Sequence, residues 1–249
     1  SWYGLGPSSD DAAVRAADEV VRVSPSKVEA FSRCALRWLL EAAGGTAGDS
    51  ASQSIGTLVH DLAAEAATRG LSAEETLALL EERWGAVDVV GGWYGETQRE
   101  RARVLVQRVT AYVGSHSDHL VAAEHPFEVA VGRAVLAGRV DRLERAGEAG
   151  LVVVDLKTGK SRPSAADLGE PPQLRTYQVA VEAGAFDDVA PGERRSGGAR
   201  LVHLGSGSKT AVQAQPPLAD TDDPDWARRL VATTPERMAG RSLLAETNT

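Results

Sequence analysis

The first half of the chain repeats apolar residues three or four positions apart, which is the spacing of one helix face. The segment SPSKVEAFSRCALRWLL (24–40) adds a capping serine and a proline at the first helical position, so a helix is predicted there. The same spacing predicts three further helices: IGTLVHDLAAEAATRG (55–70), SAEETLALLEERW (72–84), which has a Ser72/Glu75 capping box, and ETQRERARVLVQRVTAYVGSH (96–116). We interpret GGTAGDSASQS (44–54) as a flexible linker and GAVDVVGGWYG (85–95) as a loop.

From residue 121 onward the pattern changes to apolar runs with glycine turns between them, which is typical of strands. AAEHPFEVAV (122–131), AVLAGRVDRLERAG (134–147) and GLVVVDLKTGK (150–160) predict a three-stranded meander. Beyond it we expect a helix at PPQLRTYQVAVEAGAF (171–186), strands at ARLVHLG (199–205) and AVQAQ (211–215), and a helix near Pro224. The predicted fold class is α/β, with a mixed sheet flanked by helices and a helical N-terminal portion.

This pattern divides the chain into four parts. They are an N-terminal lead or linker (1–23), a helical part (24–120), an α/β core (121–212) and a C-terminal strand, helix and tail (213–249). The sequence does not begin with methionine, so we expect a domain of a longer polypeptide.

Composition narrows the function classes. No run approaches the roughly 18 apolar residues of a membrane span, and the N-terminus has no signal-peptide pattern, so we expect a cytoplasmic protein without membrane partners. Cys34 is the only cysteine, which excludes an internal disulfide or a cysteine-built metal cluster. The net charge of −8 argues against nonspecific coating of nucleic acid. It permits a nucleic-acid enzyme whose metal ions supply local positive charge.

The run GLVVVDLKTGK ends in candidate chemistry. Strand alternation places Asp155 and Lys157 on one face, and Asp141 ends GRVD on the preceding strand. Two carboxylates about 4 Å apart repel by roughly 4 kcal/mol at an effective dielectric near 20. A hard cation such as Mg²⁺ or Mn²⁺ relieves that repulsion, and Lys157 can orient water and stabilise charge on a phosphoryl oxygen. Such parts suit metal-assisted phosphodiester hydrolysis.

A plainer interpretation of Asp155 and Lys157 stays open, because strand ends often carry an exposed Asp–Lys pair that forms a weak surface salt bridge. Three features favour a site instead: the apolar run before Asp155, the glycine shortly after Lys157, and Asp141 one strand earlier.

His60 and two residues of the later helix are further candidates. His60 lies roughly 160–200° from the apolar stripe of its helix, on a face with small residues such as Gly56, where it is either a metal ligand or an ordinary histidine. Gln173 and Tyr177 are four positions apart and share a helix face that either supports the site or DNA or is plain surface.

Other polar motifs are set aside. The remaining histidines lack ligand spacing and are left out of any metal site: His116, His119, His125 and His203. GSGSKT (205–210) has Ser208 where a Walker A motif needs glycine, so a hairpin turn is the preferred interpretation.

Taken together, five motifs in order resemble a PD-(D/E)XK nuclease of the RecB type, the nuclease domain of bacterial helicase–nucleases such as the AddAB and AdnAB machines. They are the opening helix at SPSKVEAFSRCALRWLL, GTLVH, GRVD, VVDLKTGK and QLRTYQVA, within residues 24–204. The resemblance implies a restriction-endonuclease-like core in which His60, Asp141, Asp155 and the main-chain carbonyl of Leu156 bind Mg²⁺ or Mn²⁺. It further implies catalytic roles for Lys157, Asp155 and Asp141, and a supporting or DNA-binding role for Gln173 and Tyr177.

One departure from the family pattern concerns the cysteines. Some relatives hold an iron–sulfur cluster with four cysteines, the first of them in the opening helix where Cys34 stands. This chain offers no partners for Cys34. The resemblance therefore implies a branch without an iron–sulfur cluster, in which Cys34 packs as a small apolar residue.

The function implied is a metal-dependent deoxyribonuclease of the bacterial cytoplasm that acts in double-strand-break repair and recombination. It is expected to act as an exonuclease on DNA strands delivered by a fused or associated helicase motor. Two alternatives stay open: a noncatalytic DNA-guiding or scaffolding module, and a stand-alone structure-specific endonuclease.

Overall fold

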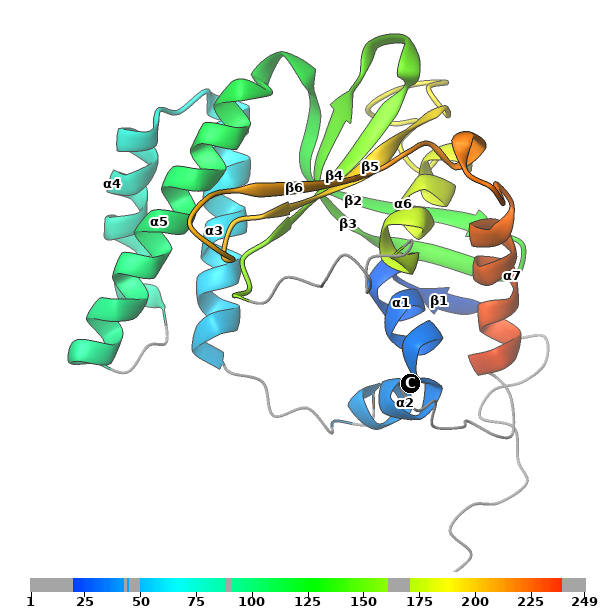
Figure 1. Cartoon of the computed structure of the whole chain (residues 1–249), viewed down its shortest axis with the longest axis horizontal. Helices are drawn as coiled ribbons and strands as arrows, with labels where there is room; N and C mark the ends of the chain where they lie inside the picture. Colours follow the sequence, from blue (N-terminus) through cyan, green and yellow to red (C-terminus); the bar gives the residue numbers. More distant parts are fainter. Residues whose placement is uncertain (1–19, 43, 45–49, 88–90, 161–170, 239–249) are drawn as a thin grey trace, which may run out of the picture.

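The computed structural model describes residues 20–42, 44, 50–87, 91–160 and 171–238. These residues form one six-stranded mixed sheet with helices on both faces, which confirms the α/β class (Figure 1). The strands are β1 (Val21–Val23), β2 (Leu120–Val131), β3 (Ala134–Arg145), β4 (Leu151–Lys157), β5 (Ser196–His203) and β6 (Ala211–Gln215). The helices are α1 (Pro25–Arg33), α2 (Ala35–Ala42), α3 (Ser50–Arg69), α4 (Ala73–Arg83), α5 (Trp93–Ser115), α6 (Pro172–Glu182) and α7 (Trp226–Met238).

The meander predicted over β2, β3 and β4 is confirmed, because both of its strand pairs are antiparallel. The chain then crosses through α6 to β5, which is parallel to β4, and β6 returns antiparallel to β5. The segment GSGSKT lies in this last connection, so the predicted turn is also confirmed.

The long strand β3 has two partners on one of its edges. Residues 134–136 pair with β1 and residues 142–145 pair with β4. Among the described strands, none pairs with residues 137–141 on that edge. Asp141 is therefore the last residue before β3 and β4 pair, at the point where the two strands diverge.

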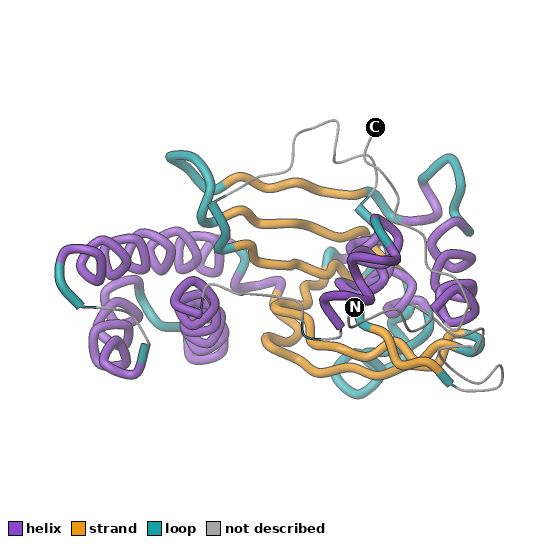
Figure 2. The backbone as a smooth tube through the Cα atoms, turned by 90° about the horizontal axis from the view of Figure 1, so that it is seen from below, coloured by secondary structure: helices purple, strands orange, loops and turns teal. Residues whose placement is uncertain are grey.

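The sheet separates two hydrophobic cores, as Figure 2 shows from below with helices on either side of the strands. Leu151 and Val153 of β4 pack with residues of α1, α6 and α7, whereas the alternate residues of β4 pack with α3, α4 and α5. Strand alternation explains this division, since successive side chains point to opposite faces. Residues 151–156 of the run GLVVVDLKTGK are thus an inner strand that is buried on both faces.

Several details differ from the sequence analysis. The single helix predicted over residues 24–40 is two helices, because Cys34 has an extended backbone (φ −162°) and its sulfur accepts a hydrogen bond from the N–H of Arg37 (3.5 Å). The half-buried Cys34 therefore caps α2.

Three segments also have more regular structure than the sequence indicated. Helix α3 begins at Ser50, inside the predicted linker, and α5 begins at Trp93, inside the predicted loop. Strand β1 lies in the predicted lead segment, where its parallel pairing with β3 supplies the hydrogen bonds that three residues cannot provide locally. Among the described residues no helix is both long and apolar enough to cross a membrane.

Candidate active site

Asp155 and Lys157 lie at the end of β4 on the face covered by α1 and α6. Alternation along the strand puts both side chains on that face, and the Lys157 Nζ is 2.7 Å from Asp155 Oδ2. Asp155 is only 5% exposed, whereas the side chain of Lys157 keeps 39% of its surface in solvent. A surface salt bridge has two solvated partners, so this half-buried pair is a different kind of contact.

Gln173 completes a triangle with this pair. The helix α6 begins at Pro172, after Pro171, and thereby places Gln173 in its first turn against the end of β4. The Gln173 Nε2 donates to Asp155 Oδ1 (2.9 Å), and the Lys157 Nζ donates to Gln173 Oε1 (3.4 Å). Each of the three side chains therefore fixes the other two.

Asp141 connects this triangle to α3. The main-chain N–H of Leu156 donates to Asp141 Oδ2 (2.6 Å), and Asp141 Oδ1 lies 3.2 Å from His60 Nδ1. The face of α3 that carries His60 comes close to the sheet because it has small residues, and a Cβ added to Gly56 would lie 3.1 Å from Thr158 Oγ1. The small residues near His60 therefore allow close packing, which at Gly56 is against the side chain of Thr158.

Glu124 is a member of the site that the sequence analysis missed. Its Oε1 is 3.4 Å from His60 Nδ1, so two carboxylates face the same ring nitrogen. The backbone of Glu124 has φ +46°, a conformation that residues other than glycine rarely adopt, and such strain is often found at functional sites.

Glu124 can be found from the strand register of the sequence. The two-residue turn after Val131 pairs Val131 with Ala134, and counting back along this antiparallel hairpin sets Glu124 opposite Asp141. The meander alone, without its register, does not indicate Glu124.

The charges of the site shift two pKa values strongly. Burial lowers the pKa of His60, but the hydrogen bonds and negative charges of Asp141 and Glu124 outweigh burial and raise it to about 10. Burial raises the pKa of Asp155 to about 6, against the opposing effect of the Lys157 ammonium. Without a bound cation, His60 is therefore protonated at neutral pH, and the pocket between the two carboxylates is one that attracts positive charge.

The donor set fits a divalent cation. His60, Glu124 and Asp141 each offer one ligand atom, and these three atoms all lie within 4.8 Å of one another. Carboxylate oxygens together with one imidazole suit Mn²⁺ and Mg²⁺. Asp155 is not in this group, and its carboxylate contacts Lys157 and Gln173.

Tyr177 lies one turn further along α6 and is buried. Its hydroxyl donates to the carbonyl of Arg139 (3.4 Å), its ring packs against Phe127, and burial raises its pKa far above the usual range. Gln173 and Tyr177 are 8% and 7% exposed, so both are better placed to support β3 and β4 than to contact a large ligand.

Two cavities border the site. One, of about 450 Å³, lies on the α1 and α6 side and is lined by Lys157, Gln173 and residues of α1 and α2. The other, of about 560 Å³, lies on the α3 side and is lined by His60, Glu124 and Thr158 among others. The end of β4 separates the two, so both the lysine and the histidine side of the site are reached from solvent.

One comparison with known proteins identifies the family of the chain. A protein-family profile described as the PD-(D/E)XK nuclease superfamily matches residues 22–249, whereas no curated protein matches the chain. Among solved structures, one titled "Crystal structure of SSO0001" is similar, with 15% sequence identity and a TM-score of 0.41 over 90% of this chain and 78% of that chain. The profile covers every residue of the site and nearly the whole sequence, and the chain therefore belongs to the PD-(D/E)XK nuclease superfamily.

Proposed function

We propose that the chain is a metal-dependent deoxyribonuclease that hydrolyses phosphodiester bonds at the end of β4. The observation that carries the proposal is the arrangement of Asp155, Lys157 and Gln173, joined through the amide of Leu156 to Asp141 and His60. Membership of a nuclease superfamily supports the reaction class. The exonuclease action, the role in double-strand-break repair and the helicase motor remain proposals, supported by the ordered RecB-type motifs in the sequence.

In this proposal His60, Glu124 and Asp141 would hold Mg²⁺ or Mn²⁺, and the family resemblance adds Asp155 and the main-chain carbonyl of Leu156 as ligands. The cation, when bound, polarises the scissile phosphate and neutralises charge in the transition state. Asp141 is aimed by the Leu156 amide, and Asp155 is aimed by the amide of Gln173. These contacts hold the carboxylates in place before substrate binds.

Lys157 has the catalytic role of a cation beside the reacting phosphate. Its ammonium is fixed by Asp155 and Gln173 but remains partly exposed, so it can donate to a phosphoryl oxygen as negative charge grows during in-line attack by water. A preorganised donor of this kind is worth more in a half-buried site than in water.

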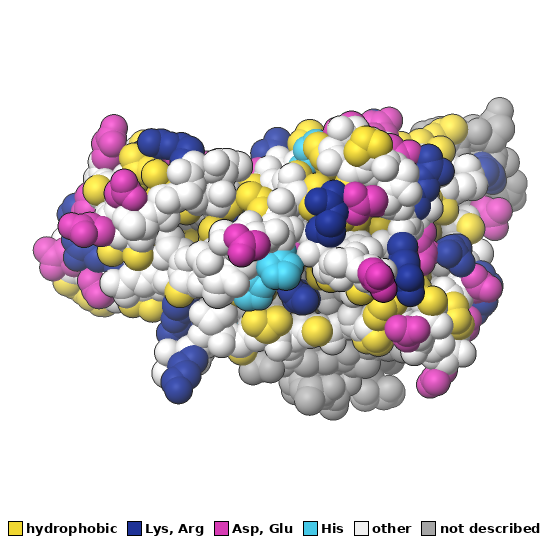
Figure 3. Space-filling view, turned by 90° about the horizontal axis from the view of Figure 1, so that it is seen from above, with side chains coloured by type: hydrophobic (Ala, Val, Ile, Leu, Met, Phe, Trp, Pro, Cys, Tyr) yellow, Lys and Arg dark blue, Asp and Glu magenta, His cyan; other side chains and the backbone are white. Residues whose placement is uncertain are grey.

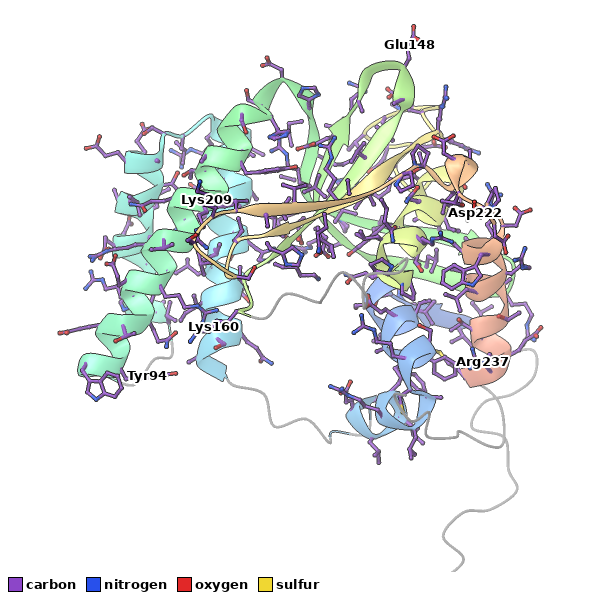
Figure 4. The ribbon with its side chains drawn as sticks, viewed as in Figure 1. Tyr94, Glu148, Lys160, Lys209, Asp222 and Arg237 are labelled. Carbon is purple, nitrogen blue, oxygen red and sulfur yellow. The ribbon has the colours of Figure 1, made fainter. Side chains whose placement is uncertain are left out.

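The test is a cleavage assay of the 249-residue chain on linear and circular DNA, single- and double-stranded, with Mg²⁺, Mn²⁺ or EDTA. We expect metal-dependent cleavage that Asp155→Ala abolishes, while the circular dichroism spectrum is unchanged. Asp222→Ala, a substitution of an exposed aspartate away from the site (Figure 4), is the matched control and should cleave like the wild type.

The outcomes separate the alternatives. Full activity of Asp155→Ala would contradict the site assignment, and no cleavage with any metal would contradict the nuclease and favour a scaffolding module. Cutting of covalently closed circles would favour an endonuclease over an exonuclease that needs an end.

A further inference from the structure

Two loops meet beside Lys157, where β4 and β5 end next to α5. One follows β4 (158–160) and the other joins β5 to β6 (204–210), and we call these residues the lysine edge. The N–H groups of Leu204 and Gly205 both point to the carbonyl of Lys157, at 2.9 and 3.3 Å. A Cβ on Gly205 would lie 2.1 Å from the carbonyl oxygen of Thr158, so the loops touch where only glycine fits. The segment GSGSKT, set aside above as a turn, thus lies directly against the loop of the active-site lysine.

Two arginines of α5 hold the lysine edge in place. Arg101 donates to the carbonyl of Thr158 (2.8 Å), and Arg108 donates to the carbonyls of Leu204 and Gly207. These arginines are seven positions apart and therefore share one helix face. A carbonyl partner orients a guanidinium but does not cancel its charge, so both arginines add positive potential to the edge.

Most lysines of the chain lie in the lysine edge or directly before it. The protein has four lysines, and three of them are Lys157, Lys160 and Lys209. Lys160 and Lys209 are exposed and form no ion pair with any carboxylate in the described part of the chain. Figure 4 shows both on the side of the molecule where α3 and α5 lie.

Most arginines elsewhere are matched by acidic groups. Surface pairs of this kind are Arg83 with Glu65, Arg145 with Glu193, and Arg228 with Glu182. Figure 3 shows the result on one face, where basic and acidic side chains are interleaved. In a chain of net charge −8, the lysine edge therefore carries, among the described residues, positive charge without a carboxylate partner close to the active site.

We propose that the lysine edge binds the sugar–phosphate backbone of the DNA strand on one side of the scissile phosphate. The inference rests on the proposed function and adds to it the residues that hold the substrate. Lys160 and Lys209 supply the phosphate contacts, and Arg101 and Arg108 fix the two loops that carry them. Contacts to phosphates position a strand without reading its sequence, so the edge confers affinity rather than base preference.

Binding is measured apart from cleavage. The wild-type chain and variants are prepared in the Asp155→Ala background, in EDTA, and titrated against a fluorescein-labelled single-stranded oligonucleotide by anisotropy from 0.1 to 1 M NaCl. For single strands the logarithm of affinity falls with the logarithm of salt with a slope of about −0.7 per phosphate contact. Lys160→Ala/Lys209→Ala should therefore make the slope of log affinity against log salt less negative by about 1.4. This change corresponds to a roughly 25-fold loss of affinity at 0.1 M salt and almost none at 1 M.

The control variant changes the net charge by the same amount, but at positions outside the lysine edge. Arg133 lies in the β2–β3 turn and Arg195 before β5, both exposed and without a carboxylate partner among the described residues. Arg133→Ala/Arg195→Ala should bind with the slope of the parent, and Lys160→Arg/Lys209→Arg should retain the parent affinity.

Equal slopes for Lys160→Ala/Lys209→Ala and Arg133→Ala/Arg195→Ala would overturn the inference. A loss of binding that persists at 1 M salt would overturn it as well. The proposed function fails differently, since its failure is the absence of metal-dependent cleavage by a chain with intact Asp155. A chain that cleaves DNA but gives equal slopes would retain the nuclease assignment and lose the lysine edge.

Discussion

The main-chain N–H of Leu156 donates a 2.6 Å hydrogen bond to the carboxylate of Asp141. β3 and β4 are paired only as far as Arg142 and Val154, so this bond replaces the ladder where the strands begin to diverge. It also joins the two halves of the site, because Asp155 precedes Leu156 and His60 contacts the other oxygen of Asp141. The two strands thus diverge at the candidate metal site, and one hydrogen bond holds Asp141 against β4.

Asp155→Asn should stabilise the metal-free protein. The pKa of Asp155 is raised from 3.8 to about 6, so its ionisation in the folded state costs stability above pH 6, and this cost vanishes below about pH 4. A shift of this size corresponds to a gain on the order of 1–3 kcal/mol for the variant at pH 7. Urea unfolding in EDTA at pH 4 and pH 7 measures it, and a gain of equal size at both pH values would contradict this cause.

Glu124→Gln should weaken Mn²⁺ binding by roughly 10- to 100-fold, because it removes one of the two carboxylate charges that face His60. Isothermal titration with Mn²⁺ gives the affinity independently of cleavage. Glu128→Gln, on the same strand but exposed and paired with Arg22, is the control and should leave the affinity unchanged. Equal affinities for both variants would place Glu124 outside the metal site.

Gln173→Ala should lower kcat by roughly 10- to 100-fold, because Lys157 and Asp155 both lose the amide that orients them. The dissociation constant for DNA should stay the same, since Gln173 is only 8% exposed. Single-turnover cleavage and anisotropy measure the two quantities separately. A variant that binds DNA more weakly but cleaves at the normal rate would show that Gln173 contacts the substrate instead.

Glu144→Ala should destabilise the fold by about 3–5 kcal/mol. Glu144 is 2% exposed and accepts from Arg142 (2.6 Å) and Arg200 (2.9 Å), so its removal leaves two cations without their carboxylate. Glu193→Ala removes the exposed partner of Arg145 and should cost less than about 1 kcal/mol. Chemical denaturation measures both, and similar small losses would mean that water replaces Glu144 in the variant.

Gly205→Ala should destabilise the chain by about 1–3 kcal/mol and slow cleavage, because its methyl group would displace the loop that follows Lys157. Gly159→Ala is the matched control, since a Cβ there meets nothing within 4 Å. Unfolding and cleavage of the two variants should therefore differ. A Gly205→Ala chain as stable and active as Gly159→Ala would show that the two loops do not need their close contact.

Local patterns predicted much of the fold. The Ser72/Glu75 capping box, the β2–β3–β4 meander and the α6 start at Pro172 all follow from residues close together in the chain, and all are present. The pattern missed β1, whose hydrogen bonds come from β3 more than a hundred residues later. It also missed the break at Cys34, since the spacing of apolar residues continues through it.

The features of the candidate site also divide into those that local sequence predicts and those that it does not. The sequence by itself determined that Asp155 and Lys157 share a strand face, that Asp141 lies one strand before them, and that Gln173 begins the next helix. Only the tertiary structure decided that Gln173 contacts Asp155 and Lys157, that Glu124 shares His60 with Asp141, and that GSGSKT lies against the carbonyl of Lys157. The reason is physical: the periods of helix and strand fix directions along one element, whereas strand register, twist and helix packing fix which elements meet.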